Sequence, residues 1–315
     1  MAALSSQVQL NPPLELEGLL STLGSPQPQA AAKLLGEDLL VAMVCSPQQA
    51  DGGPEFELLA QAAKEASIQL ESVVWSDPEV HWQAYDALLP LRVWDYTMRA
   101  SSFRHWLSER ETEGSVLINS AALIRWNLDK GYLIELQELG VSMPKTELRL
   151  AGSRNPGSWP AHTSLVAKPR LGAGGVGIEL LPSAGWQPPA RDLLVQRYRP
   201  LINSCGEISL LMVEGQPCGQ VRRHSSGDDF RVGATWGGSS HPEPVDPLAA
   251  ELACQVIKQL PETPLYARVD IWDFEQPYLL AEVELVEPEL FLGLIDGAAE
   301  LIAEHLRNRL LRSKA

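Results

Sequence analysis

The sequence predicts an open α/β sheet over residues 38–120, followed by an α+β region over residues 121–315. In the first region apolar runs alternate with helical patterns, which is the order of parallel strands joined by crossover helices. In the second region the strand-like runs are joined by glycine and proline turns, which indicate antiparallel hairpins. A content of 45% hydrophobic and 21% charged residues is typical of a folded globular chain.

The first region begins with a continuous apolar run at residues 39–44, which is typical of a buried parallel strand. Further strand-like runs occupy residues 68–75, 87–93 and 115–119. Helical patterns occupy residues 55–66, 101–111 and 120–139. Residues 1–37 carry recurrent proline and glutamine, so we interpret them as an N-terminal extension.

The second region contains short strand-like runs bounded by turn residues, at residues 166–169, 178–181, 193–198, 208–214 and 220–223. A helix is predicted over residues 246–259. Two longer strands, at residues 266–274 and 278–286, precede a final helix over residues 296–311. The last turns of that helix carry arginines, which suit the helix dipole.

The chain is acidic, with 40 acidic and 25 basic residues and a formal net charge of −15. Binding nucleic-acid phosphates requires a basic face, and acidity disfavours anionic membranes, so we expect neither partner.

No apolar run is long enough to span a bilayer, and residues 1–29 lack the basic residues of a targeting signal, which favours a cytoplasmic protein. The four cysteines are far apart and are predicted to be reduced thiols rather than disulfides or zinc ligands.

A run of glycines follows Lys168. These glycines are Gly172, Gly174, Gly175 and Gly177. A dinucleotide-binding loop requires a helix directly after its glycines, whereas residues 178–181 are strand-like. We therefore interpret residues 172–177 as a glycine flap between two antiparallel strands, whose backbone N–H groups can cover phosphates while Lys168 reaches an oxygen. The alternative is a flexible hairpin tip beside a surface lysine.

Carboxylates cluster in the two late strands. Asp270 lies in the first, and Glu282 and Glu284 point to one face of the second because side chains alternate along a strand. If the strands pair as a hairpin through residues 275–277, the three carboxylates converge, and such hard oxygen ligands suit Mg²⁺ near phosphate. The alternative is an exposed strand face with alternating acids.

Taken together, these motifs resemble those of the ATP-grasp superfamily, in its glutathione-synthetase-like branch of carboxylate–amine ligases. The similarity covers about residues 120–290, in the family's motif order. It implies the ATP-grasp fold, in which two subdomains clasp ATP. Residues 121–195 would form the small subdomain with the glycine flap, and residues 196–315 the C-terminal subdomain with the metal site. Residues 38–120 would form the α/β domain that precedes them.

The resemblance also implies roles for individual residues. Lys130 and Lys168 would be the two lysines that bind the nucleotide, beside the glycine flap with Gly172, Gly174, Gly175 and Gly177. The hinge that contacts adenine would consist of Gln196, Arg197 and Tyr198, and Glu207 would be the acid that holds the ribose. Arg231 and Arg268 would be the catalytic residues, facing the phosphates and the acyl group. Asp270, Glu282 and Glu284 would bind two Mg²⁺ ions.

Two positions depart from the family pattern. Glu284 stands where many members have Asn, which adds negative charge to the metal site. Gln196 stands where some relatives have Glu, which bears on adenine recognition. Residues 94–96, 122–127 and 286–292 resemble a narrower subgroup, which includes the cyclo-ligase that closes O-ureido-serine to cycloserine.

Substrate contacts are predicted at the end of the strand over residues 87–93, because α/β sheets bind ligands beyond the carboxyl ends of their strands. The residues concerned are Trp94, Asp95, Tyr96 and Arg99. The alternative is that these four side chains serve packing and surface charge.

The resemblance implies that ATP, with Mg²⁺, activates a small-molecule carboxylate as an acylphosphate, which an amine then attacks. A metabolite kinase or a nucleotide-binding regulatory protein would share the nucleotide residues, so both stay open as alternatives. Relatives are often dimers, so a homodimer is compatible with the resemblance. The sequence names neither the acid nor the amine, and it leaves open whether both lie in one molecule.

Overall fold

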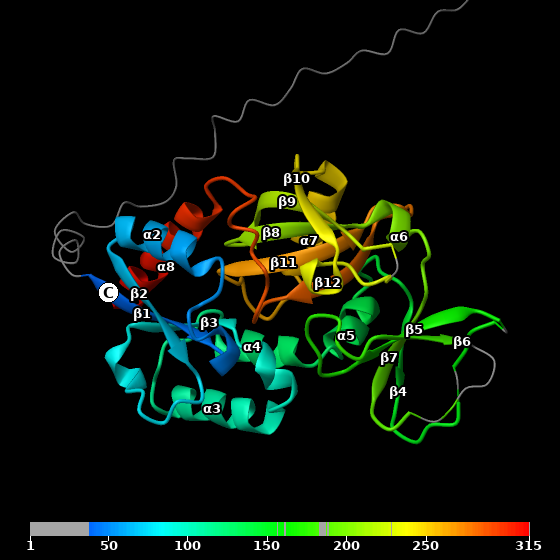
Figure 1. Ribbon diagram of the computed structural model, residues 1–315, viewed down its shortest axis with the longest axis horizontal. Coiled ribbons are helices and arrows are strands. Elements are labelled where there is room, and N and C mark those ends of the chain that lie inside the picture. Colours follow the sequence, from blue (N-terminus) through cyan, green and yellow to red (C-terminus); the bar gives the residue numbers. More distant parts are fainter. Residues whose placement is uncertain are drawn as a thin grey trace, which may run out of the picture. The chain divides into compact units, whose positions relative to one another are not determined.

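The structure is a computed structural model that describes residues 38–155, 157–160, 162–182, 187, 189–227 and 229–314 (Figure 1). The N-terminal extension predicted at residues 1–37 lies outside the described residues, so its role stays a prediction.

Three parallel strands form the first sheet. They are β1 (Leu39–Cys45), β2 (Ile68–Val74) and β3 (Ala87–Arg92), in the order β2-β1-β3. The connections contain α2 (Phe56–Glu65) and the short 3-10 helices η1 (Pro47–Gln49) and η2 (Trp82–Ala84). After β3 the chain continues through the 3-10 helix η3 (Trp94–Thr97) and α3 (Ala100–Thr112). The central strand is almost completely buried, as its continuous apolar run requires. The predicted parallel α/β sheet is confirmed.

The strand predicted at residues 115–119 does not form. Leu117 makes only an isolated bridge to Leu88. Asn119 turns instead to the C-terminal part of the chain, where its Nδ2 donates to the carbonyl oxygens of Tyr266 and Leu285, both at 2.9 Å. Its Oδ1 accepts from the backbone N–H of Leu265 at 2.7 Å. These bonds lead the chain out of the first sheet, so this prediction was wrong.

The single helix predicted over residues 120–139 is two helices, α4 (Ala121–Leu128) and α5 (Tyr132–Glu138). Asp129 interrupts the helix because its side chain accepts from the backbone N–H of Gly131 at 2.8 Å. The N–H of Lys130 donates to the carbonyl oxygen of Arg170 at 2.8 Å rather than to a helical carbonyl. The break therefore places Lys130 at a helix junction, beside the beginning of the glycine flap.

The second sheet is antiparallel and has four strands in the order β4-β7-β5-β6. The strands are β4 (Thr146–Arg149), β5 (Ser164–Pro169), β6 (Glu179–Pro182) and β7 (Leu193–Arg197). Strands β5 and β6 pair as a hairpin around the glycine flap, which confirms that a strand and not a helix follows the glycines. Strand β4 was not predicted, because four residues at a sheet edge carry no clear alternation.

The third sheet is also antiparallel, with five strands in the order β10-β9-β8-β11-β12. They are β8 (Glu207–Val213), β9 (Gln216–His224), β10 (Ser239–Glu243), β11 (Tyr266–Trp272) and β12 (Leu279–Glu284). The helices of this part are α6 (Ile202–Cys205), η4 (Ala234–Trp236), α7 (Pro247–Ile257) and α8 (Ala298–Lys314). None of the helices in the described ranges is long and apolar enough to cross a membrane.

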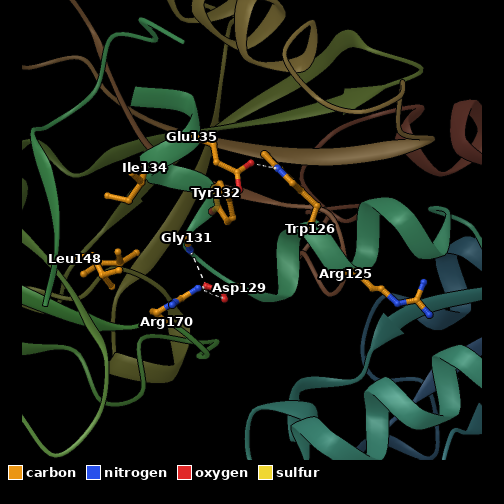
Figure 2. Close-up of a pocket in the computed structure, with 10 residues that line it drawn as sticks. Arg125, Trp126, Asp129, Gly131, Tyr132, Ile134, Glu135, Leu148 and Arg170 are labelled. Atoms are coloured by element: carbon orange, nitrogen blue, oxygen red, sulfur yellow. Dashed lines mark hydrogen bonds and ion pairs between the residues drawn. The ribbon is translucent and has the colours of Figure 1, made fainter. Parts of the chain in front are cut away.

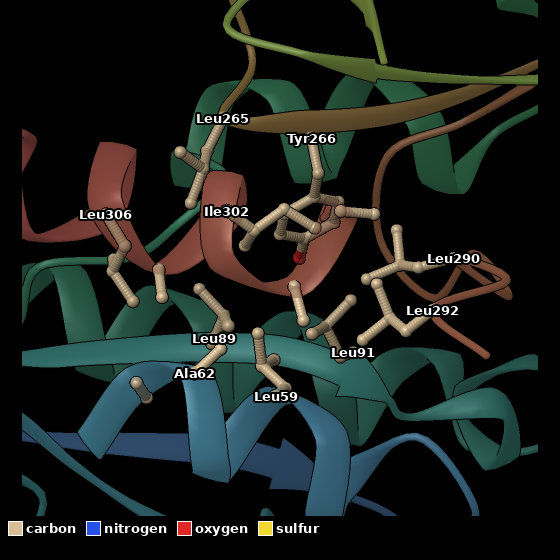
Figure 3. Close-up of a cluster of buried hydrophobic side chains, with 14 of the residues drawn as sticks. Leu59, Ala62, Leu89, Leu91, Leu265, Tyr266, Leu290, Leu292, Ile302 and Leu306 are labelled. Carbon is tan, nitrogen blue, oxygen red and sulfur yellow. The ribbon is translucent and has the colours of Figure 1, made fainter. Parts of the chain in front are cut away.

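The five-stranded sheet is buried on both faces. On one face, Ile208, Leu210 and Val269 pack with α7 and with α5. On the other face, Tyr266 packs with α8 and with residues of α2 and β3 (Figure 3). The C-terminal helix thus shares a core with the first sheet, and β11 runs between two apolar layers. This burial fixes the position of the charged side chains on β11 and β12.

Candidate active site

The late strand pair forms the hairpin that the sequence predicted. Strands β11 and β12 pair antiparallel, with Arg268 opposite Glu284 and Asp270 opposite Glu282. The register therefore brings the two glutamates and the aspartate to neighbouring positions, next to an arginine.

Asp270 is held by two arginines and a serine. The guanidinium of Arg268 donates from Nε to Oδ1 at 2.9 Å and from Nη2 to Oδ2 at 3.0 Å. Arg223 donates to Oδ2 at 2.8 Å, and Ser209 donates to Oδ1 at 2.6 Å. Burial disfavours the charged form, but Arg223 and Arg268 outweigh it and lower the pKa of Asp270 to about 2. This carboxylate is therefore ionised and fixed in place.

Arg223 is a member of the site that the sequence did not indicate. It lies on β9, where it also pairs with Glu207, so it joins the acid expected to hold the ribose to the carboxylate of Asp270. Trp272 Nε1 donates to the other oxygen of Glu207 at 3.1 Å. Burial raises the pKa of Glu207 despite Arg223. The only signal in the sequence is a pair of arginines, Arg222 and Arg223, inside a predicted strand.

The two lysines expected at the nucleotide have different surroundings. The Nζ of Lys130 forms an ion pair with Glu282, and this carboxylate raises the pKa of Lys130 although burial opposes the charge. Lys168 lies on β5 and is only 8% exposed. In the described part of the chain no hydrogen bond or ion pair engages its amine, and burial lowers its pKa.

Two further glutamates lie beyond the lysines. Burial raises the pKa of Glu284 to about 7, although Arg268 opposes the shift. Burial and the charge of Glu284 raise the pKa of Glu287 to about 8, and the hydroxyl of Tyr96 donates to Glu287 at 2.8 Å. Hard carboxylate oxygens whose charge is disfavoured by crowding fit a divalent cation such as Mg²⁺.

In this structure the proposed metal-binding carboxylates already form ion pairs with cations of the protein. Among the residues that the structure describes, no three acidic, histidine or cysteine side chains are grouped closely enough to hold a metal ion. Lys130 contacts Glu282, and Arg268 contacts Glu284. Metal binding by these residues therefore requires the two cations to give up part of these contacts.

The glycine flap is anchored at its base by Arg170. The guanidinium of Arg170 donates from Nε and Nη2 to the two carboxylate oxygens of Asp129, at 2.9 and 2.5 Å (Figure 2). Both residues line a cavity of about 370 Å³ between α4, α5 and strands β4 and β7. Burial opposes the charge of Asp129, but its bonds to Arg170 lower its pKa. This ion pair, which the sequence did not indicate, ties the flap to the segment that carries Lys130.

The tip of the flap lies beside Arg231. Trp236 donates from its indole Nε1 to the carbonyl oxygen of Gly174 at 2.9 Å, and the guanidinium of Arg231 stacks on the same indole. Asp229 accepts from Nε of Arg231 at 2.9 Å. Arg231 is thus placed at the flap rather than among the carboxylates of β11 and β12.

The hinge residues lie at the end of β7. Gln196 is buried and donates to the hydroxyl of Thr146 at 2.8 Å, while Arg197 is exposed. Tyr198 packs edge-on against Phe230. These positions border the four-stranded sheet where it passes into β8, but the adenine contact itself stays a prediction.

The four predicted substrate residues are not brought together. Tyr96 reaches Glu287, whereas Asp95 accepts from the indole of Trp75 at 2.9 Å and pairs with Arg99 at 3.4 Å. Arg99 also stacks on Trp75 and lines a separate cavity of about 490 Å³. The ring of Trp94 stacks with the guanidinium of Arg92 instead. The contacts of Asp95 and Arg99 fit the alternative that these side chains serve packing and surface charge. Of the four residues, only Tyr96 extends toward the acidic strand pair.

Comparisons with known proteins show which sequences this chain resembles. A family model described as the N-terminal domain of D-cycloserine synthetase DcsG matches residues 41–119. The chain is 25% identical over 283 residues to the cycloserine biosynthesis protein DcsG of Streptomyces lavendulae, a match that covers 80% of this chain and 92% of that protein. It is 27% identical over 198 residues to a glutathione synthetase of Prochlorococcus marinus, covering 58% of this chain and 61% of that protein.

Solved structures give the same result at the level of the fold. The crystal structure of D-cycloserine synthetase DcsG superposes with a TM-score of 0.75 at 21% identity, covering 86% of this chain and 99% of that one. A D-alanine–D-alanine ligase from Bacillus anthracis superposes with a TM-score of 0.56 at 13% identity, covering 89% of this chain and 100% of that one. The resemblance seen in the sequence is confirmed, and the protein has the fold of the ATP-grasp ligases.

Proposed function

We propose that this protein is an ATP-dependent carboxylate–amine ligase, which activates a small-molecule carboxylate as an acylphosphate and joins it to an amine. One observation carries the proposal: four cations gather at the carboxylates of β11 and β12, and the glycine flap follows directly on the strand that carries Lys168. Three of the cations are buried, namely Lys168, Arg223 and Arg268, and Lys130 is partly buried. Such a group of cations in a chain of net charge −15 suits a small polyanion. The relatives named as cycloserine, glutathione and D-alanine–D-alanine ligases support the same chemistry.

The nucleotide is proposed to lie between the four-stranded and the five-stranded sheet. Gln196, Arg197 and Tyr198 would contact the adenine, and Glu207 the ribose. Lys130 and Lys168 would neutralise the phosphates, and Gly172, Gly174, Gly175 and Gly177 would cover them with backbone N–H groups. A related ligase, PsnB, has been solved with Mg and ADP, which supports ATP and Mg²⁺ as the cofactors.

Asp270, Glu282 and Glu284 are proposed to hold Mg²⁺, with two ions as the expected number. The ion supplies positive charge at the terminal phosphates. The residues of the chain then act on the acyl group. Arg268 is fixed by Asp270 and Glu284, so its guanidinium presents N–H donors without further ordering. Arg231, at the tip of the flap, would add a second cation on the phosphate side.

The reaction consists of two displacements. A carboxylate oxygen of the acid attacks the γ-phosphorus of ATP, the bond from phosphorus to the bridging oxygen breaks, and ADP leaves. The amine nitrogen then attacks the acyl carbon, the carbon–oxygen bond to phosphate breaks, and phosphate and a proton leave. Arg268 would stabilise the oxyanion of this second step, and the flap would exclude water from the acylphosphate.

The relatives direct the choice of substrates. The first probes are O-ureido-serine, D-alanine, and amino acids and dipeptides in pairs, each tested for ATP-dependent ADP release, with products identified by mass spectrometry. A ligase yields ADP, phosphate and an amide or a ring closed through a C–N bond. Hydroxylamine added in place of the amine should be converted to a hydroxamate.

Two results would contradict the proposal. A phosphorylated product that persists, with no hydroxamate from a confirmed substrate, would identify a kinase. Nucleotide binding without ADP release across all probes would favour a regulatory protein. The first experiment also decides between cyclisation and coupling, because a cyclic product forms from one substrate molecule.

A further inference from the structure

The glycine flap reaches the five-stranded part of the chain through one tryptophan. Trp236 Nε1 donates to the carbonyl oxygen of Gly174 at 2.9 Å. Among the residues described, this is the only hydrogen bond from residues 172–177 to a residue outside the β5–β6 hairpin. Trp236 ends η4, between β9 and β10, so the bond connects an element of the five-stranded sheet to a loop of the four-stranded sheet.

The close approach depends on a glycine in the flap. A Cβ atom at Gly175 would lie 2.8 Å from Nε1 of Trp236 and 3.4 Å from Cδ of Arg231. Gly175 also has a φ of +73°, a conformation that side-chain-bearing residues rarely adopt. Gly175 therefore allows the flap to lie directly against the indole.

The same indole supports Arg231. The guanidinium stacks on the ring of Trp236, while the carboxylate of Asp229 fixes its Nε at 2.9 Å. One side chain thus contacts both the flap and the arginine expected to face the phosphates. A movement of Trp236 would change both positions together.

The flap has few other means of keeping its position. Gly174, Gly175 and Gly177 all have positive φ, so the open flap has large conformational freedom. On the other side, Ala173 packs against the hydrophobic cluster of the first sheet. The flap is therefore held between this apolar contact and the hydrogen bond from Trp236.

We propose that Trp236 is a positioning residue of the ligase reaction. Its indole N–H holds the glycine flap closed, and its ring fixes the position of the Arg231 guanidinium. The effect of Trp236 on catalysis rests on the proposed ligase function, whereas its effect on the flap does not. Water attacks an acylphosphate that is not covered, so a flap that opens early diverts the intermediate to hydrolysis. Loss of the indole N–H is expected to lower the yield of amide per ADP more than it weakens nucleotide binding.

The direct test is Trp236→Phe, which keeps an aromatic ring under Arg231 and removes the donor to Gly174. Hydrogen–deuterium exchange is measured on the peptide that contains residues 170–178, with Mg²⁺ and the non-hydrolysable analogue AMPPNP. We expect exchange roughly fivefold faster than in the unmodified protein, the scale of one lost hydrogen bond. Trp236→Ala removes the stack as well and should additionally slow ADP release.

The matched control is Trp159→Phe. The indole Nε1 of Trp159 is buried and has no hydrogen-bond partner among the residues described, and its ring packs on the small core of the four-stranded sheet. This variant should exchange in the flap at the rate of the unmodified protein. Gly175→Ala provides a second route to the same loss, because its Cβ would push the flap away from Trp236, and it should also accelerate exchange.

The second readout is the ratio of amide to ADP, measured with the substrate pair found by the ADP-release screen. The ratio should fall at least severalfold in Trp236→Phe and stay unchanged in Trp159→Phe. Equal flap exchange in Trp236→Phe and Trp159→Phe, both folded by their thermal transitions, would overturn the proposal. Exchange with AMPPNP needs no substrate, so a failed substrate screen would count against the ligase function and not against the role of Trp236.

Discussion

Two lysines lie at the proposed phosphate site, and they differ in the side chains that contact them. Lys130 is paired with Glu282, which keeps its amine charged in the free protein. Lys168 is buried more completely, at 8% exposed, and contacts no carboxylate among the residues described, and burial lowers its pKa. The amine of Lys130 thus already contacts a carboxylate of the protein, whereas the amine of Lys168 can take an anionic ligand as its partner.

This difference indicates two separate tasks. A cation already paired with a carboxylate gains less from a phosphate, because it must give up part of an existing contact. A buried amine that contacts no carboxylate directly gains the most from an anionic ligand, because the ligand offsets its cost of desolvation. Lys168 should therefore control nucleotide binding, while Lys130 and Glu282 should hold the metal-side carboxylates in order.

The largest expected effect is that of Lys168→Ala. Removing the unpaired cation should lower ADP release with a confirmed substrate by roughly 10²–10³-fold, as for loss of one donor to a developing charge. Lys258→Ala, at an exposed position after α7, is the control and should retain full activity. Full turnover in folded Lys168→Ala would contradict the assignment of the phosphate site.

Replacing Glu282 by Gln tests the paired lysine. The substitution leaves Lys130 buried without its counter-charge and removes one proposed metal ligand, so turnover should fall roughly hundredfold, the scale of a broken buried ion pair. Circular dichroism should show that the fold is kept. Glu304→Gln, on the exposed face of α8, should be neutral. Equal activity of the two variants would show that the pair has no part in the reaction.

Asp129→Asn tests the base of the flap. The bidentate bond to Arg170 becomes a weaker neutral one, so KM for ATP should rise about tenfold, in line with the loss of a charge-assisted hydrogen bond. Asp192→Asn weakens the longer contact to Arg170, at 3.4 Å, and keeps an amide oxygen to accept from the backbone N–H of Ala151. This variant should change KM less than twofold, the scale of an exposed ion pair. If both variants have the same KM, the link between the flap and Lys130 does not contribute to binding.

The smallest effect is one of pH. Burial lowers the pKa of Lys168 in the free protein, and phosphate oxygens favour its charged form, so the complex binds more protons than the free protein. Nucleotide affinity should therefore rise as the pH falls between the bound and the free pKa of Lys168. Calorimetry in two buffers of different ionisation enthalpy should detect proton uptake on binding AMPPNP. Lys168→Met should abolish this uptake, and proton release by the unmodified protein would disprove it.

The sequence could predict the acidic strand pair because its pattern is local. Glu282 and Glu284 alternate along one strand, and a short turn brings Asp270 alongside. The exact register could not be predicted, because an irregularity between Asp270 and Ile271 shifts the pairing and sets Asp270 opposite Glu282. The glycine flap was predictable for the same reason, since the strand after the glycines is directly visible.

Contacts between distant segments could not be predicted in this way. Arg170 and Asp129 are 41 positions apart, and their bond joins the base of the flap to the break between α4 and α5. Trp236 and Gly174 are 62 positions apart and come from different sheets. Strand β10 has the sequence SSHPE, which lacks an apolar face, and it forms by pairing with β9 rather than by its own preference.

The position of α8 has a consequence for the order in which the chain matures. Leu306 of α8 packs in the same cluster as Leu89 of the first sheet and Leu59 of α2. During translation that face of the first sheet emerges without its cover, because α8 follows all three sheets in the chain. The nascent chain therefore carries an uncovered apolar surface until α8 has been synthesised, which makes chaperone binding during translation advantageous and removal of α8 damaging to the first sheet.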